Sequence, residues 1–209
     1  MARLISPSCK LCRREGIKLF LKGTRCSTGK CAIEKRNFPP GQHGHNRRKL
    51  SDYGVQLREK QKMKKIYGIL EKPFNYAFKK AARKKGVTGE NLIQLMEQRL
   101  DNTVFRLSFV PSRAEARQFV LHGHLFVNNR CVNIPSFQVK AGDVIELRKK
   151  EGVQKRVKEN LENLLKDRTV PEWLALDQEN LKATVMRAPT KPEAGLPVEE
   201  SMIVELYSK

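Results

Sequence analysis

Four cysteines in the first third of the chain have the spacing of zinc ligands. Two residues separate Cys9 from Cys12, four separate Cys26 from Cys31, and thirteen lie between the two pairs. Cysteine pairs at such spacings are typical of structural zinc sites, in which four thiolates close the tetrahedral coordination sphere. The spacing therefore predicts one structural Zn²⁺ ion and not a catalytic metal.

Three alternatives to this zinc site stay open. Two disulfides would also staple the segment, but we identify no secretory segment and expect a reducing, cytoplasmic environment, which disfavours them. Four unrelated thiols are a second alternative, and His43 or His45 in place of one thiolate is a third. A bound zinc ion would contribute on the order of 10 kcal/mol to the local folding free energy. Cys131 lies far away between strand-like residues, and we expect it to be a small buried side chain.

The net charge of the chain is concentrated in its first half. The 209 residues carry a formal charge of +20, and the first hundred contain 25 Lys and Arg against 7 Asp and Glu. The remaining 109 contain 17 against 15. Such a charge destabilises the compact state by self-repulsion unless a polyanion neutralises it. Because no apolar run is long enough to span a bilayer, a nucleic acid is the favoured partner and a membrane is not.

Helix signals dominate the segment after residue 50. Before it, residues 38–45 contain two prolines and two glycines and predict a hinge. Ser51 is a good N-cap residue for a basic amphipathic helix. The expected helices cover 51–68, 73–85 and about 89–104.

The pattern then changes to that of a compact α+β module at about 99–148. Ser112 is followed by a glutamate three residues later, a capping-box match that opens a short helix closed at Gly123. The Asn128-Asn129 pair can take the positive φ angles of a hairpin turn. Expected strands lie at 125–127, 130–132, 138–139, 144–147, 173–176 and 183–186, with a helix at 151–166, a linker at 189–197 and a tail helix at 202–207.

The helix that follows Ser112 presents polar side chains able to follow a phosphate backbone. Its N-terminus is a natural seat for a phosphate. A solvated charged face would give the same pattern, but the charge of the neighbouring segment favours contact with RNA or DNA. The expected basic ridge consists of Arg99, Arg106, Arg113, Arg117, Gln118, His122 and His124.

No catalytic constellation accompanies this ridge. The sequence contains no nucleophile-elbow serine, no glycine-rich phosphate loop followed by a lysine and no carboxylate pair in an apolar setting. Arg99-Leu100-Asp101 resembles the tripeptide around the catalytic aspartate of some RNA pseudouridine synthases, but the chain has no room for that catalytic domain. We expect Leu100 in the core and Asp101 to offset local positive charge, and we predict that the protein is not an enzyme.

Several segments of the chain are similar to one known family. They are PPGQHG at 39–44, SDYGVQLREKQKMKKIYGI at 51–69, RLDNTVFRLSFVPSRAEARQFVLHGHLFVNNRCVNIPS at 99–136, AGDVI at 141–145 and the ending ELYSK. They resemble the bacterial type of the small-subunit ribosomal protein four family, and the four cysteines resemble its zinc-binding branch. The 99–148 segment is similar to the RNA-binding module named after that family. The chain departs from the family pattern at Ser108, which is usually glycine, and at Asn129 of the usual Asn-Gly turn.

The resemblance implies a structural constituent of the small ribosomal subunit, located in the cytoplasm on the ribosome. It implies early, direct binding to 16S rRNA that nucleates assembly of the subunit body. The implied neighbours are ribosomal proteins three and five and the messenger RNA in the channel through which it enters. The resemblance also implies that contact with protein five affects decoding accuracy. The chain is implied to act as a single copy, not as a homo-oligomer, and repression of its own operon, known for some members, stays open.

These considerations together predict an α+β fold in three parts. The parts are a basic zinc-binding segment at 1–45, a mostly helical rRNA-binding domain at 46–98 to which a tail at 198–209 returns, and an α+β domain at 99–197 that contains the RNA-binding module. The expected rRNA contacts are Arg3, Arg13, Arg14, Arg25, Arg36, His43, Arg47, Arg48, Lys49, Arg58, Lys62, Lys65, Lys84, Lys85, Arg99, Arg106, Ser112, Arg113, Arg117, Gln118, His122 and His124. The alternatives are an RNA-modifying enzyme or an RNA-binding regulator that uses the same module, and a zinc-finger regulator of DNA.

Overall fold

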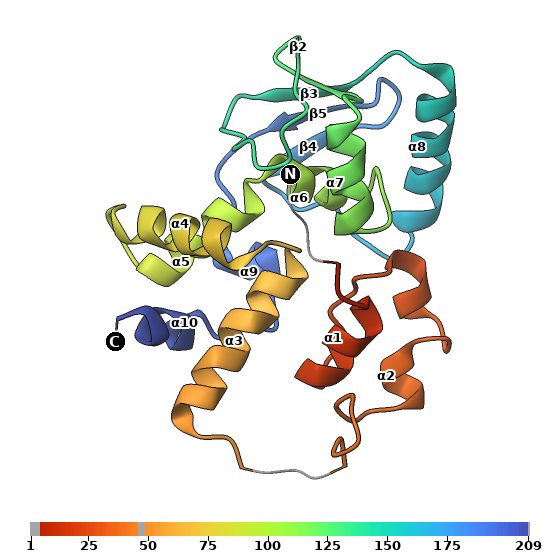
Figure 1. Cartoon of the computed structure of the whole chain (residues 1–209). Coiled ribbons are helices and arrows are strands. Elements are labelled where there is room, and N and C mark those ends of the chain that lie inside the picture. Colours follow the sequence, from red (N-terminus) through yellow and green to blue (C-terminus); the bar gives the residue numbers. More distant parts are fainter. Residues whose placement is uncertain (1–4, 46–48, 209) are drawn as a thin grey trace. The chain divides into compact units, whose positions relative to one another are not determined.

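The computed structural model describes residues 5–45 and 49–208, and it confirms an α+β protein. The chain divides into two compact units, which are treated separately below (Figure 1). Unit 1 comprises Met1–Leu92 and Leu196–Lys209, and unit 2 comprises Ile93–Gly195. Among the described residues, no helix combines the length and the apolar character needed to cross a membrane. The expected contacts Arg3, Arg47 and Arg48 lie outside the described residues.

Unit 1 is helical in its described parts. Its elements are α1 (Ser8–Glu15), the 3-10 helix η1 (Gly23–Ser27), α2 (Ala32–Lys35), α3 (Asp52–Ile66), α4 (Glu71–Ala82), the first half of α5 (Thr88–Glu97) and α10 (Glu200–Tyr207). The two expected helices that become α3 and α4 are confirmed. The Ser51 hydroxyl caps α3 by accepting a hydrogen bond from the Gly54 backbone N–H at 3.2 Å. The short helices of the cysteine segment were not indicated by the sequence.

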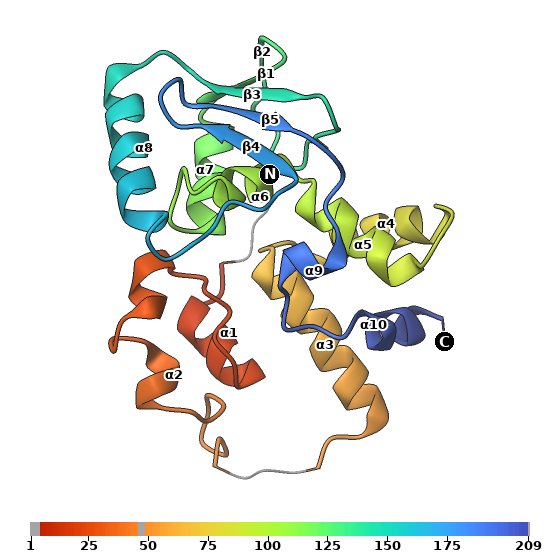
Figure 2. The same ribbon diagram turned by 180° about the vertical axis from the view of Figure 1, so that it is seen from behind.

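The C-terminal helix α10 packs against α3, and both ribbon views show the two helices together (Figures 1 and 2). Tyr207 stacks on Phe78 with ring centroids 4.3 Å apart, and its hydroxyl donates to Glu71 at 3.1 Å. Burial opposes ionisation of Glu71, but hydrogen bonds from Lys60 and Lys64 outweigh it and lower the pKa of this carboxyl to about 2. The predicted tail helix is therefore present and is fixed within unit 1 by ring stacking and a hydrogen bond.

Unit 2 is built on one antiparallel sheet. Strands β1 (Leu125–Val127), β2 (Arg130–Cys131), β3 (Val144–Leu147), β4 (Leu174–Asp177) and β5 (Lys182–Val185) pair in the order β2-β1-β3-β5-β4. Helices α6 (Leu100–Arg106) and α7 (Arg113–Leu121) lie against one face, with α8 (Glu151–Leu164) beside them (Figure 2). Trp173, Phe109 and Ile145 are fully buried in the shared core. The strands expected on either side of α8 thus belong to one sheet.

The third helix expected from the sequence is wrong as a single element, because α5 ends at Glu97 and α6 begins at Leu100. The Leu100 backbone N–H donates to the carbonyl oxygen of Phe137 at 2.8 Å, which replaces a helical hydrogen bond. Arg99 is extended, with φ −66° and ψ 135°, and pairs with Gln138 in an isolated β-bridge. The strand expected at 138–139 is therefore reduced to this single bridge. Pairing with a distant segment therefore overrides the local helical pattern.

Two smaller expectations are also wrong. Cys131 is exposed, because β2 is an edge strand that contributes no buried side chain. The proline-rich linker contains a short helix, α9 (Lys191–Ala194), which Thr190 and Glu193 cap reciprocally. The expected hairpin turn is confirmed, since Asn128 and Asn129 have φ angles of 49° and 63°.

Ser108 is expected to be a position at which glycine stabilises the protein. This residue has a φ of 58°, is fully buried, and its hydroxyl has no hydrogen-bond partner within the described residues. Ser108→Gly relieves left-handed strain and removes the unpaired hydroxyl, so we expect the free energy of unfolding to rise by about 1 kcal/mol. Urea unfolding followed by the fluorescence of Trp173, the single tryptophan, measures this change.

Ser108→Ala is the matched control, because it removes the hydroxyl and keeps the side chain in the left-handed region. We expect it to gain less stability than Ser108→Gly. A glycine variant no more stable than the wild type would contradict the strain at this position.

Candidate nucleic-acid interface

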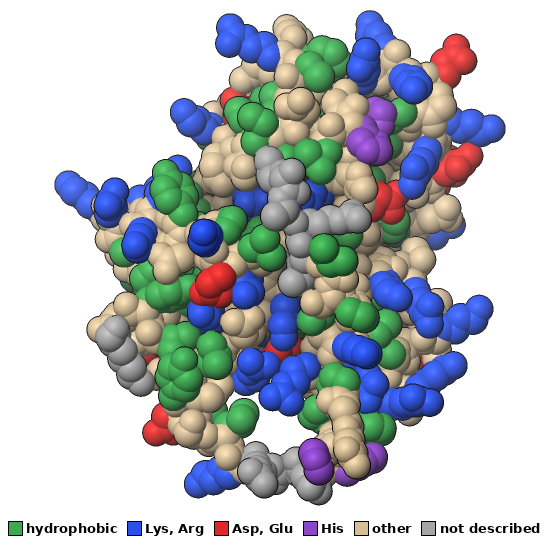
Figure 3. All heavy atoms as spheres, viewed as in Figure 1, with side chains coloured by type: hydrophobic (Ala, Val, Ile, Leu, Met, Phe, Trp, Pro, Cys, Tyr) green, Lys and Arg blue, Asp and Glu red, His purple; other side chains and the backbone are tan. Residues whose placement is uncertain are grey.

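A cationic pocket lies in the N-terminal part of unit 1. Helices α1, η1 and α2 supply its lining, and Figure 3 shows Lys and Arg side chains gathered over this part of the unit. Arg13 is held in place, since its Nε donates to the Phe38 carbonyl oxygen at 3.0 Å and its guanidinium lies 4.8 Å from the Phe38 ring centroid. No carboxylate is among the described residues that line the pocket. Those residues are Cys9, Lys10, Arg13, Arg25, Lys30, Ala32, Lys35 and Arg36.

The four cysteines of the predicted zinc site converge on a second pocket in the same segment. Cys9, Cys12, Cys26 and Cys31 all line it, and Cys9 also lines the cationic pocket. Burial raises the pKa of the Cys12 thiol, and the three other cysteines raise it further. Neither histidine of the hinge lines this pocket. Within the described ranges, no three His, Cys, Asp or Glu side chains are already arranged as a metal-binding group.

Three of the expected contacts on α3 are engaged in ion pairs within unit 1. Arg58 and Lys65 both pair with Glu15 of α1, whose side chain is 1% exposed. Lys62 pairs with Glu59 on the same helix. Arg58 and Lys65 therefore hold α1 against α3, and the side chains of all three cations remain partly exposed.

Other expected contacts of unit 1 are exposed cations. Arg14, Arg25, Arg36, Lys49, Lys84 and Lys85 all have exposed side chains, as does His43. Lys84 and Lys85 follow the end of α4, where the Asn91 amide donates to their carbonyl oxygens at 3.3 and 3.2 Å, respectively. This cap fixes the direction in which the chain leaves α4.

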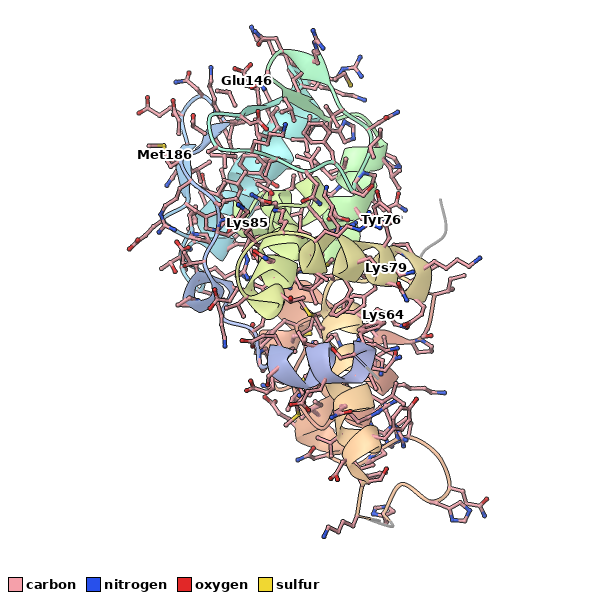
Figure 4. All side chains as sticks on the ribbon, turned by 90° about the vertical axis from the view of Figure 1, so that its left-hand side faces the viewer. Lys64, Tyr76, Lys79, Lys85, Glu146 and Met186 are labelled. Atoms are coloured by element: carbon pink, nitrogen blue, oxygen red, sulfur yellow. The ribbon has the colours of Figure 1, made fainter. Side chains whose placement is uncertain are left out.

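Tyr76 on α4 is a candidate contact that the sequence analysis missed. Its side chain is 72% exposed and, with Lys79, it points away from the helix toward solvent (Figure 4). Lys72 and Lys80, four residues before and after Tyr76, are also exposed. An exposed aromatic ring among lysines is suited to stacking on an unpaired base. Its position outside the apolar stripe of the helix was the signal that could have found it.

Three arginines of the expected ridge in unit 2 are paired with buried carboxylates. Arg99 is 6% exposed and donates to both oxygens of Asp101, at 3.0 and 2.7 Å. Arg106 donates to both oxygens of Glu97, at 2.7 and 2.8 Å. Arg117 also lies 3.6 Å from Asp101. These arginines are thus placed to orient α6 and α7.

The remaining ridge residues divide between internal and exposed positions. Arg113 donates from Nε to Asn102 Oδ1 at 2.8 Å, and the Ser112 hydroxyl caps α7 by accepting from the Glu115 backbone N–H at 3.3 Å. Gln118 and His122 are exposed, and His124 is half-buried. The part of the ridge that faces solvent therefore lies at the C-terminal end of α7.

Comparison with known proteins defines the class to which this fold belongs. Residues 3–97 match the family model of the ribosomal protein S4/S9 N-terminal domain, and residues 98–145 match that of the S4 domain, an RNA-binding module. Unit 1 and unit 2 thus have the two components of a ribosomal RNA-binding protein.

Named relatives narrow this class to one family. The chain is 57% identical to the small ribosomal subunit protein uS4 of Geobacter sp. (strain M21), 56% to that of Citrifermentans bemidjiense and 55% to that of Desulforamulus reducens. Each alignment covers 209 residues and the whole of both chains. The chain belongs to the ribosomal protein uS4 family.

Proposed function

We propose that this chain is a structural constituent of the small ribosomal subunit that binds 16S rRNA and has no enzymatic activity. The observation that carries the proposal is the cationic pocket of α1, η1 and α2, where six Lys and Arg residues face one concavity with no acidic residue in its described lining. Phosphate groups are the ligands that such a surface neutralises. Because the chain belongs to a family of ribosomal proteins, the phosphate groups are proposed to be those of 16S rRNA.

The finer assignments rest on the same membership. We propose that binding to 16S rRNA is early and nucleates assembly of the subunit body. The chain would lie beside ribosomal proteins three and five, near the channel through which messenger RNA enters, and would influence decoding accuracy. It would act as one copy per subunit, and repression of its own operon is a further expectation.

The expected contact residues fall into two roles in this proposal. Exposed cations such as Arg14, Arg25, Arg36 and Lys85 would neutralise phosphates directly. The internally paired arginines of unit 2 would act as positioning residues, because their guanidinium groups already satisfy buried carboxylates. This division reduces the number of direct contacts expected from unit 2.

We also propose one structural zinc ion bound by Cys9, Cys12, Cys26 and Cys31. The donor set supports it, since four soft sulfur ligands suit Zn²⁺ and line one pocket. Binding would draw the four sulfur atoms together and release the protons of their thiols. Because Cys9 also lines the cationic pocket, the ion would stabilise the walls of the proposed phosphate surface.

A competition experiment tests the RNA-binding proposal. Labelled 16S rRNA is bound by the full chain and challenged with unlabelled 16S rRNA or with duplex DNA of equal length. We expect rRNA to compete far better, and the affinity to fall by about 10³-fold or more between 50 and 200 mM salt, as for proteins that neutralise six or more phosphates. Preference for duplex DNA, or an affinity that does not change with salt, would contradict the proposal.

A further inference from the structure

The two histidines of unit 2 lie where three basic residues from other segments converge. His124 precedes β1, and its carbonyl oxygen accepts a hydrogen bond from the Arg148 backbone N–H at 2.8 Å. This bond continues the register of β1 and β3, in which Leu125 is opposite Leu147. Arg148 is exposed, so His124 and a basic side chain are held opposite each other at the end of the two strands.

The rings of the two histidines are close together, and His124 is the more buried of the two. Their centroids are 5.8 Å apart in an edge-to-face arrangement, and His124 also lies 5.0 Å from the Phe119 ring. His122 is exposed. The Nδ1 atom of His124 is buried without a hydrogen-bond partner among the described residues. Nε2 is therefore the nitrogen of His124 through which a ligand could act.

The charged groups around His124 are predominantly cationic. Burial lowers the pKa of this imidazole, and His122, Lys150, Arg148 and Arg156 lower it further. The charged form of His124 is therefore disfavoured in the free protein.

Two further titratable groups lie on neighbouring elements. Glu115 of α7, the carboxylate near these cations, is paired with Arg156 of α8. On the side of β2, the Cys131 thiol donates to the Gly123 carbonyl oxygen at 3.7 Å. In Figure 3 the histidine side chains of unit 2 lie at the surface with Lys and Arg side chains near them. An approaching anion would thus meet the cations named above, and the carboxylate of Glu115 is already paired with one of them.

We propose that His122 and His124, together with Arg148, Lys150 and Arg156, form a phosphate site that takes up a proton when it binds the RNA backbone. The inference rests on the proposed function and adds both a location in unit 2 and a dependence on pH. Arg148, Lys150 and Arg156 are not among the contacts expected from the sequence.

The physical reason is the change in local charge when RNA binds. A backbone phosphate offsets the cations that disfavour a charged His124 and offers an acceptor to its N–H group. The pKa of His124 is lowered in the free protein and would be higher in the complex. Between these two values the complex holds one more proton than its separated components. Affinity for RNA therefore rises as the pH falls through this window.

Binding of full-length 16S rRNA to the full chain at two pH values tests the inference. We expect binding to be about three- to tenfold tighter near pH 6 than near pH 7.5, because uptake of one proton changes affinity by at most tenfold per pH unit. Backbone phosphodiesters keep their charge over this range. Calorimetry in buffers of different ionisation enthalpy should show uptake of a proton in the complex.

Variants separate this site from other groups that titrate. His124→Gln is expected to remove most of the pH dependence, whatever its affinity near pH 7.5, and urea unfolding followed by Trp173 fluorescence checks that it is folded. His122→Asn, at an exposed position, should reduce the dependence without affecting the fold. The control is a His43→Gln and His45→Gln double variant, which should keep the full dependence.

The outcomes separate the proton-linked site from the proposed function. Tight binding with the same affinity at both pH values would overturn the proton-linked site and leave the proposed function intact. A pH dependence lost in the His43 and His45 variant but kept in His124→Gln would also overturn it. Absence of 16S rRNA binding at either pH would instead contradict the proposed function itself.

Discussion

Arg106→Met is expected to lower the free energy of unfolding of unit 2 by about 3–5 kcal/mol, the cost of removing one partner of a buried ion pair. Glu97 is 1% exposed at its side chain and accepts two hydrogen bonds from Arg106. The variant removes both of these hydrogen bonds, while the Asn102 amide still donates to the carboxylate at 2.9 Å. Urea unfolding monitored by Trp173 fluorescence measures the loss, since this residue is fully buried in unit 2.

Arg187→Met is the matched control for this prediction. Arg187 also pairs with a glutamate, Glu193, at 2.7 Å, but its side chain is 44% exposed. Exposed pairs contribute little to stability, so we expect a much smaller change than for Arg106→Met. Equal effects of the two substitutions would contradict the stabilising role of the buried network.

Arg106→Met also distinguishes a positioning residue from a direct phosphate contact. If Arg106 acts by holding α5, α6 and the chain near Ala194, its loss leaves the number of neutralised phosphates unchanged. The slope of log affinity against log salt should then equal that of the wild type wherever the variant is folded. A slope smaller by about one unit would instead indicate a direct contact with phosphate.

Replacing Cys9 and Cys12 together by serine is expected to abolish zinc binding and to unfold the N-terminal segment locally. A structural zinc ion contributes on the order of 10 kcal/mol where it binds, far more than the small apolar core of this segment can replace. Hydrogen exchange should show loss of protection in α1, η1 and α2. Affinity for 16S rRNA should fall as well, because these helices carry the cationic pocket.

Cys131→Ser is the control for thiol chemistry elsewhere in the chain. This cysteine is exposed on β2 and distant in sequence from the other four, so we expect unchanged zinc content, protection and affinity. A native protein that contains no zinc by metal analysis would contradict the proposed site. So would a Cys9 and Cys12 variant with native protection.

Local chemistry in the sequence was sufficient to predict most of the helices and strands. Ser51 and Ser112 were identified as N-caps by residue type alone, and both hydroxyls accept the expected backbone hydrogen bonds. The turn at Asn128 and Asn129 follows from the tolerance of asparagine for positive φ. Such features depend on neighbours in the sequence and are visible in it.

Features that depend on distant segments were not predictable in this way. The break before Leu100 exists because the backbone near Phe137 offers a competing hydrogen bond. The joining of β3 to β5 brings together strands separated by the whole of α8. Neither partner can be identified from the periodicity of a single segment.

The candidate site shows the same division. Residue type predicted a surface rich in cations, and the exposed Arg14, Arg25 and Arg36 agree with it. The internal roles of Arg99 and Arg106 could not be predicted, because an arginine has the same appearance in sequence whether its partner is a phosphate or a buried carboxylate. The structure supplies those partners.

Sedimentation of cell extract tests the central claim most directly. The protein is detected across a sucrose gradient that separates free protein from small ribosomal subunits and whole ribosomes. We predict that it sediments with the small subunit at physiological salt, in one copy per subunit, and stays with it when the two subunits are separated. A protein found mainly in the free fractions, with small subunits that lack it, would contradict the account.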